Sequence, residues 1–213
     1  MGKLKIGLIG CGGIAGAHTE RLKTLEDAQL VAFADIVEDK AKSFSKKYGG
    51  RPYLDWRTML DKEKLDLVWI CLPPFAHEDE VMVAAERGVN IFIEKPIALD
   101  MDLAKAMVRA VEKAGVKSQV GYCSRFAYGV EEARRLVESG EAGDLGLALG
   151  WYWCHFLGEG WWRDRNRSGG QIVEQSTHVF DVLRHLCGEV EVAYGQMNTV
   201  FWKDVPDLSL IHI

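Results

Sequence analysis

The sequence predicts an α/β fold, a parallel sheet with helices on both faces, followed by a smaller α+β part. Three observations predict it. An apolar run at residues 4–9 ends in a glycine-rich turn, and a helix-forming segment follows at once. Strand-like and helix-like segments then alternate, which is typical of parallel sheets. This alternation stops near Gly121, so we expect one domain at residues 1–121 and a second at 122–213.

The glycine-rich turn lies between the first strand and a helix predicted at residues 14–25. Gly10, Gly12 and Ala15 fill the pattern G-x-G-x-x-[GA]. Small residues at these positions allow a tight turn, close approach of a pyrophosphate, and close packing of helix on strand. The helix N-terminus adds free N–H groups and a partial positive charge. The pattern predicts a Rossmann dinucleotide-binding domain, with Gly10, Gly12, Gly13 and Ile14 at the cofactor.

The second predicted strand, residues 29–34, ends at an acidic residue, Asp35. In dinucleotide-binding domains an acid about twenty residues beyond the glycines binds the adenosine ribose. A carboxylate accepts hydrogen bonds from ribose hydroxyls but repels a 2′-phosphate, so NAD is favoured over NADP. The alternative is that Asp35 only ends the strand or caps the next helix. The joint occurrence of the glycines and the acid argues against that alternative.

The remaining elements follow from apolar periodicity and from Gly and Pro residues at their ends. In the first domain we expect helices at 38–48, 78–87 and 103–114, and strands at 65–71, 90–94 and 117–122. In the second we expect helices at 128–139 and 172–187, and strands at 145–156 and 190–200.

The composition is that of an ordinary globular protein, with 48% apolar residues, 27% charged residues and a net charge of −5. No block of Lys and Arg suggests a nucleic-acid partner. No apolar run approaches the ~20 residues that span a bilayer. The start of the chain does not resemble a signal peptide, and the five cysteines lack metal-binding or disulfide-like spacing. We therefore expect a cytoplasmic protein with no membrane partner.

Glu94, Lys95 and Pro96 follow the strand at 90–94, at the edge where open α/β sheets bind ligands. A lysine there could donate a hydrogen bond to a substrate hydroxyl or carbonyl, or act as an acid or base if burial lowered its pKa. The alternative, a solvated lysine paired with Glu94, is equally compatible with these residues alone. His77 follows Pro73 and Pro74 at another such strand end.

Acids and histidines recur on the helix predicted at 172–187. Glu174, His178, Asp181 and His185 are spaced i, i+4, i+7 and i+11, which places them in one stripe of an α-helix. Such a stripe suits proton transfer, with an acid orienting His178. A solvent-facing polar surface is the first alternative. A metal site is the least favoured, because no companion ligand motif occurs and we expect no metal.

An aromatic and cationic loop, residues 161–168, precedes that helix. Trp rings suit the faces of sugars or a nicotinamide, and Arg and Asn supply polar anchors, so Trp162 and Arg163 are candidate ligand contacts. Trp151 and Trp153 are two apart on a predicted strand, which favours packing in a core or subunit interface.

Taken together, the chain resembles the glucose–fructose oxidoreductase and inositol dehydrogenase (Gfo/Idh/MocA) family. The resemblance rests on the glycine turn, Pro73-Pro74 with His77, Glu94-Lys95-Pro96, Arg125, and Gly169-Gly170 followed by His178 and Asp181. It implies that Lys95 and His178 are the catalytic pair, assisted by Glu174, where the family often has Asp. It also implies that Pro73, His77, Glu94 and Lys95 lie at the cofactor, and that Arg125, Trp162, Arg163 and Asp181 lie at the substrate.

By this resemblance the protein is an NAD-linked oxidoreductase acting on a sugar, polyol or related cyclic alcohol. The second domain would contain an open, mainly antiparallel sheet, and the full-length protein would be a homo-oligomer. Members of the family are typically longer, so this chain is expected to lack part of that domain. Two alternatives stay open: an NAD-dependent glycoside hydrolase of the same fold, and a nucleotide-binding fragment without activity.

Overall fold

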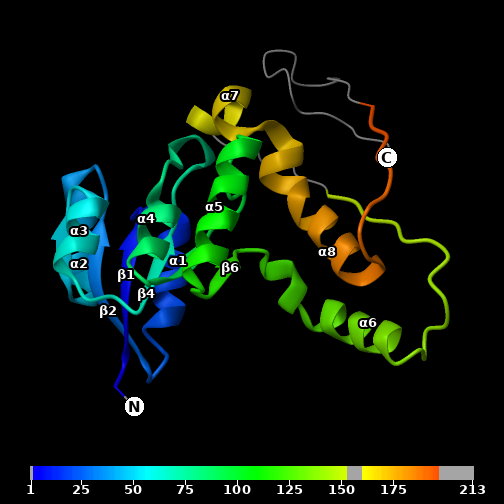
Figure 1. The fold of residues 1–213 in the computed structure, drawn as a ribbon, viewed down its shortest axis with the longest axis horizontal. Coiled ribbons are helices and arrows are strands. Elements are labelled where there is room, and N and C mark those ends of the chain that lie inside the picture. The colour runs from blue at the N-terminus through cyan, green and yellow to red at the C-terminus, as the bar shows by residue number, and fades with distance from the viewer. Residues whose placement is uncertain (1, 153–159, 197–213) are drawn as a thin grey trace. The chain divides into compact units, whose positions relative to one another are not determined.

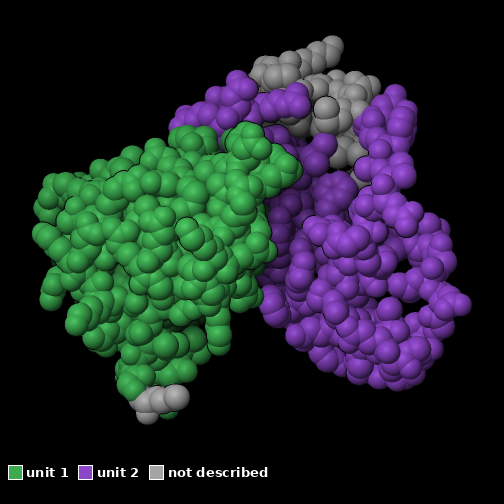
Figure 2. Space-filling model, viewed as in Figure 1, with its two compact units in different colours: residues 1–121 green, residues 122–213 purple. Residues whose placement is uncertain are grey.

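The computed structural model describes residues 2–152 and 160–196. The chain divides into two compact units, residues 1–121 and 122–213 (Figure 2). No helix in the described ranges is long and apolar enough to cross a membrane.

Unit 1, coloured from blue to green in Figure 1, is built on a six-stranded sheet. The strand order is β3-β2-β1-β4-β5-β6, and every neighbouring pair is parallel. The strands are β1 (Leu4–Ile9), β2 (Ala28–Ala34), β3 (Arg51–Tyr53), β4 (Leu67–Ile70), β5 (Asn90–Ile93) and β6 (Ser118–Val120). The chain winds outward from β1 to β3 and then restarts at β4 on the other side of β1. This order is that of the doubly wound Rossmann fold, whose switch point lies between β1 and β4.

Five helices cover the two faces of this sheet. They are α1 (Gly13–Leu22), α2 (Glu38–Tyr48), α3 (Trp56–Lys62), α4 (Glu80–Glu86) and α5 (Met101–Ala114). Side chains alternate along β1, so Ile6 and Leu8 are buried on one face while Ile9 is buried on the other. The first face packs on α1 and α2, and the second on α3, α4 and α5. A core on both faces explains why these strands are nearly continuous apolar runs.

The predicted parallel sheet is confirmed, but β3 and α3 were missed. β3 has only three residues, includes Pro52 and lies at the sheet edge, where proline is tolerated. α3 has only seven residues and is capped by the preceding Asp55, whose carboxylate accepts hydrogen bonds from the N–H groups of Arg57 and Thr58. Such short elements carry too little periodicity to be recognised.

Unit 2 is mainly helical over its described residues. Its elements are the 3₁₀ turns η2 (Cys123–Phe126) and η3 (Gly160–Arg163), the helices α6 (Tyr128–Glu138), α7 (Arg165–Ser168) and α8 (Thr177–Cys187), and the π-helical turn η4 (Ile172–Ser176). The predicted helix at 172–187 is thus an α-helix only from Thr177 onward, because its first turn is π-helical.

The two strands predicted for unit 2 are not formed where they can be checked. Residues 145–152 have no strand structure, and residues 190–196 include only an isolated bridge at Gln196. The parts at 153–156 and 197–200 lie outside the described residues. Strands require a hydrogen-bonded neighbour, and the described part of unit 2 supplies no ladder for them. Their apolar side chains are exposed instead, Leu147 by 79% and Val192 by 86%.

Candidate active site

The carboxyl ends of β1, β4 and β5 bring the predicted cofactor residues of unit 1 to one edge of the sheet. The glycine turn follows β1, the segment with Pro73 and His77 follows β4, and Glu94 and Lys95 follow β5. Since these strands are adjacent and parallel, their ends share an edge. That edge, at the switch point, is where doubly wound sheets bind ligands.

The glycines of the turn have different physical roles. Gly10 has φ +88°, and a Cβ there would lie 2.4 Å from the carbonyl oxygen of Cys71, so only glycine fits. A Cβ at Gly12 or Gly13 would meet no atom within 4 Å. Their backbone therefore stays open to a ligand. Helix α1 starts at Gly13, lacks a side-chain cap and has no acid in its first turn, while the side chain of Ile14 is half exposed. This arrangement fits an anionic group such as a diphosphate.

Asp35 is held beside that turn. Its Oδ2 accepts a hydrogen bond from the Cys11 N–H at 2.8 Å, and its Oδ1 accepts one from the Val37 N–H at 2.8 Å. The carboxylate thus joins the glycine turn to the entry of α2, which begins at Glu38. Each oxygen retains a second lone pair with which it could accept a ribose hydroxyl.

The cysteine in the turn is not a nucleophile. Burial, with a smaller contribution from the Asp35 charge, raises the pKa of the Cys11 thiol to about 12. Burial also raises the pKa of the neighbouring Cys71. Both thiols are free, and both stay protonated near neutral pH.

His77 forms a buried pair at the end of β4. Its Nδ1 lies 2.6 Å from Oε1 of Glu80, and the side chains are 1% and 0% exposed. The other oxygen of Glu80 accepts the N–H of Glu78 at 2.8 Å. The Nε2 atom of His77 is buried and has no hydrogen-bond partner among the described residues. The pair fixes the ring after the short turn η1 (Pro74–Ala76); its contact with a cofactor stays a prediction.

Glu94 and Lys95 follow β5, and the Lys95–Pro96 peptide bond is cis. The Glu94 carboxylate accepts the Lys95 N–H at 3.1 Å through Oε2. Its Oε1 lies 2.6 Å from Nε2 of His18, on α1. Nothing in the sequence around His18 indicates this contact. The two residues are 76 positions apart, so only the fold reveals that they meet.

In unit 2 the stripe predicted on one α-helical face requires correction at Glu174. This residue lies on the π-helical turn η4, whose wider turns break the α-helical spacing to His178. Glu174 and Asp181 are each 5% exposed, and His178 and His185 are half-buried. The alternative of a solvent-facing polar surface is therefore wrong for the two acids.

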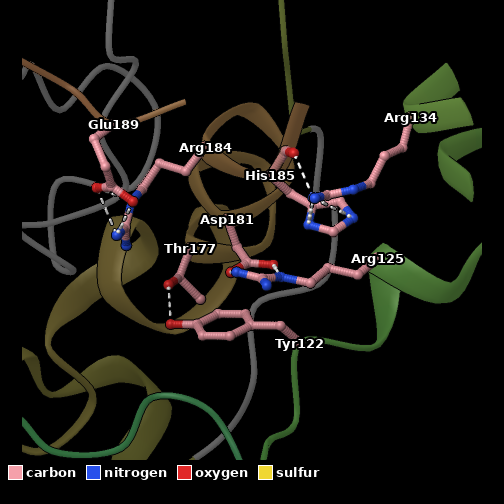
Figure 3. Close-up of polar contacts among 8 residues, drawn as sticks. All are labelled: Tyr122, Arg125, Arg134, Thr177, Asp181, Arg184, His185 and Glu189. Atoms are coloured by element: carbon pink, nitrogen blue, oxygen red, sulfur yellow. Dashed lines mark hydrogen bonds and ion pairs between the residues drawn. The ribbon is translucent and has the colours of Figure 1, made fainter. Parts of the chain in front are cut away.

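Asp181 is bound by Arg125, and the family resemblance implies that both lie at the substrate (Figure 3). The guanidinium is bidentate, with Nε 2.6 Å from Oδ2 and Nη2 near Oδ1. The hydrogen bonds to Asp181 raise the pKa of Arg125 above its usual value. The structure thus brings these two predicted residues together as an ion pair within unit 2, and their contact with substrate stays a prediction.

Tyr122 lies against the start of α8 (Figure 3). Its hydroxyl is 3.0 Å from Oγ1 of Thr177, and its ring meets the His178 ring edge-on, with centroids 6.0 Å apart. Neither Tyr122 nor Thr177 was singled out from the sequence. The Tyr122 ring restricts the orientation of His178, the histidine predicted to be catalytic, and Thr177 holds the Tyr122 hydroxyl.

His185 is engaged by Arg134 of α6 (Figure 3). Nη1 of Arg134 donates to the His185 carbonyl oxygen at 2.8 Å and lies 2.7 Å from the ring Nδ1. Arginine has no acceptor, so this ring nitrogen must accept and the imidazole is neutral. Burial, together with the charges of Arg134 and Arg125, lowers the pKa of His185. His185 therefore belongs to the packing of α8 on α6.

The aromatic loop is described from residue 160 onward. Trp161 and Trp162 lie in η3 with ring centroids 5.1 Å apart, and Arg163 is exposed. Trp151 is 69% exposed, whereas Trp153 lies outside the described residues. Trp162 and Arg163 thus lie together in η3, and their contact with a ligand stays a prediction.

The sheet order, the glycine turn at the switch point and the acid after β2 together define a Rossmann domain of the dinucleotide-binding class. The chain belongs to the Gfo/Idh/MocA family. Residues 4–122 match the family model described as "Oxidoreductase family, NAD-binding Rossmann fold", and residues 130–213 match the GFO/IDH/MocA C-terminal domain.

Several known proteins are similar to it. Myo-inositol 2-dehydrogenase of Thermotoga maritima is 28% identical over 95% of this chain and 60% of the relative. Inositol 2-dehydrogenase of Rhizobium meliloti is 30% identical over 89% of this chain and 57% of the relative. The WlbA dehydrogenase of Bordetella pertussis, solved with NADH and UDP-GlcNAcA, is 25% identical, with a TM-score of 0.84 over 94% of this chain and 62% of that structure. The chain spans about three fifths of the length of these relatives.

Proposed function

We propose that the protein is an NAD-linked oxidoreductase that acts on an alcohol group of a sugar or polyol. The observation that carries this proposal is the shared sheet edge in unit 1. It combines an open glycine turn at a helix N-terminus, the anchored carboxylate of Asp35 after β2, and a lysine after β5. The relatives named for inositol dehydrogenation support the substrate class.

Within unit 1 the residues fit NAD. Gly10, Gly12, Gly13 and Ile14 would hold the diphosphate, because the turn exposes backbone N–H groups at the start of α1. Asp35 would accept the ribose hydroxyls and disfavour a 2′-phosphate, so NAD is preferred to NADP. NAD, when bound, accepts a hydride from the substrate carbon. Pro73 and His77 would line the same edge.

The catalytic roles are carried over from the family motifs. His178 would take the proton of the substrate hydroxyl, and Lys95 would stabilise the developing alkoxide. Glu174, buried on the π-helical turn four residues before His178, would assist this histidine. The contact of Tyr122 with His178 supports a fixed ring orientation.

The substrate would be bound by polar and aromatic groups of unit 2. The proposed contacts are Arg125 and Asp181, already arranged as a bidentate pair, and Trp162 with Arg163. Hydroxyl-rich ligands suit both kinds of group, since guanidinium and carboxylate groups bind hydroxyls and indole rings cover the apolar faces of sugars.

We further propose that the second domain contains a mainly antiparallel sheet, and that the protein is a homo-oligomer located in the cytoplasm. The end of the expected strand contacts the η4–α8 segment: a Cβ at Gly150 would be 2.5 Å from Val179 of α8, and the Tyr152 hydroxyl donates to Gln175 of η4 at 2.6 Å. Every second side chain from residue 145 to residue 151 is apolar and exposed: Leu145, Leu147, Leu149 and Trp151. This pattern is typical of a strand whose apolar face packs against another surface. Light scattering would test the oligomer.

Calorimetric titration with NAD and NADP tests cofactor binding, and a polyol and sugar panel followed by NADH absorbance tests the reaction. We expect Lys95→Met and His178→Ala to abolish turnover while NAD affinity is retained. Full turnover in both variants would refute the assigned roles. Release of a sugar without accumulation of NADH would instead establish a glycoside hydrolase.

A further inference from the structure

His18 connects the helix of the glycine turn to the segment that contains Lys95, two parts of unit 1 whose relative position the proposed reaction depends on. It lies on α1, whose N-terminus forms the glycine turn, and its Nε2 is 2.6 Å from Oε1 of Glu94 at the end of β5. Glu94 is directly followed by Lys95. The side chains of His18 and Glu94 are 18% and 10% exposed, so water competes little for this contact.

The imidazole is held in place by two aromatic rings. Trp69 and Phe92 are register partners on β4 and β5, stacked with centroids 3.9 Å apart. The His18 ring lies 5.2 Å from the Trp69 ring and 5.3 Å from the Phe92 ring. This packing restricts rotation of the imidazole, so Nε2 stays directed at the carboxylate.

The Glu94 carboxylate is confined on its remaining sides. Its Oε2 accepts the backbone N–H of Lys95 at 3.1 Å. A Cβ at Gly121 would lie 3.0 Å from three carboxyl atoms of Glu94, so the carboxylate fills the space that a side chain there would need. With Oε2 accepting from the backbone, an ionised Glu94 accepts from His18 through Oε1. The carboxylate thus bridges the α1 ring and the Lys95 amide.

We propose that His18 is a positioning residue for Lys95. Through Glu94 it fixes the backbone of Lys95 relative to the helix that holds the cofactor diphosphate. The proposal rests on the proposed function, because it assumes that Lys95 acts on a substrate beside NAD. It adds a coupling: a cofactor that orders the start of α1 also stabilises the lysine backbone one strand beyond the switch point.

Two substitutions separate this role from simple packing. His18→Leu keeps apolar bulk against Trp69 and Phe92 but removes the donor, whereas His18→Gln retains an N–H that can reach Glu94. Glu20→Gln is the matched control, because Glu20 lies on the same helix and pairs with Lys23 and Lys47 at the surface.

The first readout is hydrogen exchange of the Lys95 amide in the protein without cofactor. We expect exchange in His18→Leu to be faster by about fivefold, the factor that corresponds to the net contribution of one hydrogen bond. Exchange should return towards wild type in His18→Gln and be unchanged in Glu20→Gln. NAD should slow this exchange in wild type more than in His18→Leu.

The second readout is the split between kcat and binding. His18→Leu should lower kcat about tenfold or more with NAD affinity and the thermal midpoint nearly unchanged, and His18→Gln should recover most of kcat. Wild-type exchange at Lys95 in His18→Leu, or equal losses in both His18 variants, would overturn the positioning role. Absence of NAD binding by the wild-type chain would instead overturn the proposed function.

Discussion

Replacing Gly10 or Gly12 of the turn by alanine is expected to affect different properties of the protein. Gly12→Ala should leave the fold intact and weaken NAD binding, whereas Gly10→Ala should destabilise unit 1 itself. The difference follows from backbone conformation and space. Gly12 has φ −90° and ψ −167°, which any residue adopts, and a Cβ there meets no atom within 4 Å. Gly10 has φ +88° and faces the Cys71 carbonyl.

The magnitudes can be worked from these values. At Gly10 an alanine pays about 1–2 kcal/mol for the left-handed conformation. Its Cβ at 2.4 Å from the Cys71 oxygen must also push β1 and β4 apart. We expect a loss of roughly 2–4 kcal/mol in unfolding free energy. At Gly12 the reduced entropy of the unfolded chain and the weaker N-cap nearly cancel, so the change should stay within about 1 kcal/mol.

The assay combines thermal or denaturant unfolding with NAD calorimetry on both variants. For Gly12→Ala we expect a near-normal midpoint and an NAD affinity at least tenfold weaker, about 1.4 kcal/mol, because the methyl group occupies the path of the diphosphate. An unchanged NAD affinity in a folded Gly12→Ala protein would refute the placement of the diphosphate. A wild-type midpoint in Gly10→Ala would refute the steric argument.

Two further predictions concern unit 2. Asp181→Asn should lower the unfolding free energy by about 1–3 kcal/mol, less than for a fully buried pair, because the Arg125 side chain is 38% exposed; an unchanged denaturation midpoint would contradict this. Burial and Arg134 lower the pKa of His185 below its unfolded value, so the unfolded state binds more protons and stability falls as the pH drops below about 6.5. His185→Asn should flatten the stability profile between about pH 7 and 5, and parallel profiles for the two proteins would contradict the assignment.

The fold of unit 1 could be predicted because its signals are local. β1 and its glycine turn are contiguous in sequence, and buried parallel strands appear as apolar runs. The missed elements, β3 and α3, are short and depend on an edge position and on the Asp55 cap. The strands expected in unit 2 are not formed over their described residues. A strand needs a hydrogen-bonded neighbouring strand, which a local sequence pattern does not reveal.

Some residues of the candidate site could be predicted from the sequence, whereas contacts between distant residues could not. Residues that follow strands, such as Asp35 and Lys95, could be placed at the sheet edge from the order of elements alone. The contact between His18 and Glu94 could not, since a single histidine on a helix carries no sign of a partner 76 positions away. The π-helical turn at Glu174 could not be predicted either, because the spacing of residues along a regular α-helix gives no sign of a local change in helical period.

The double anchoring of Asp35 has a consequence for protein engineering. Exchanging this acid for a small neutral residue is the obvious route to a variant that accepts NADP. Here the replacement of Asp35 would also remove the hydrogen-bond acceptors of the Cys11 and Val37 backbone N–H groups. A redesign of coenzyme preference would therefore need a replacement acceptor for those amides, introduced together with the new phosphate-binding group.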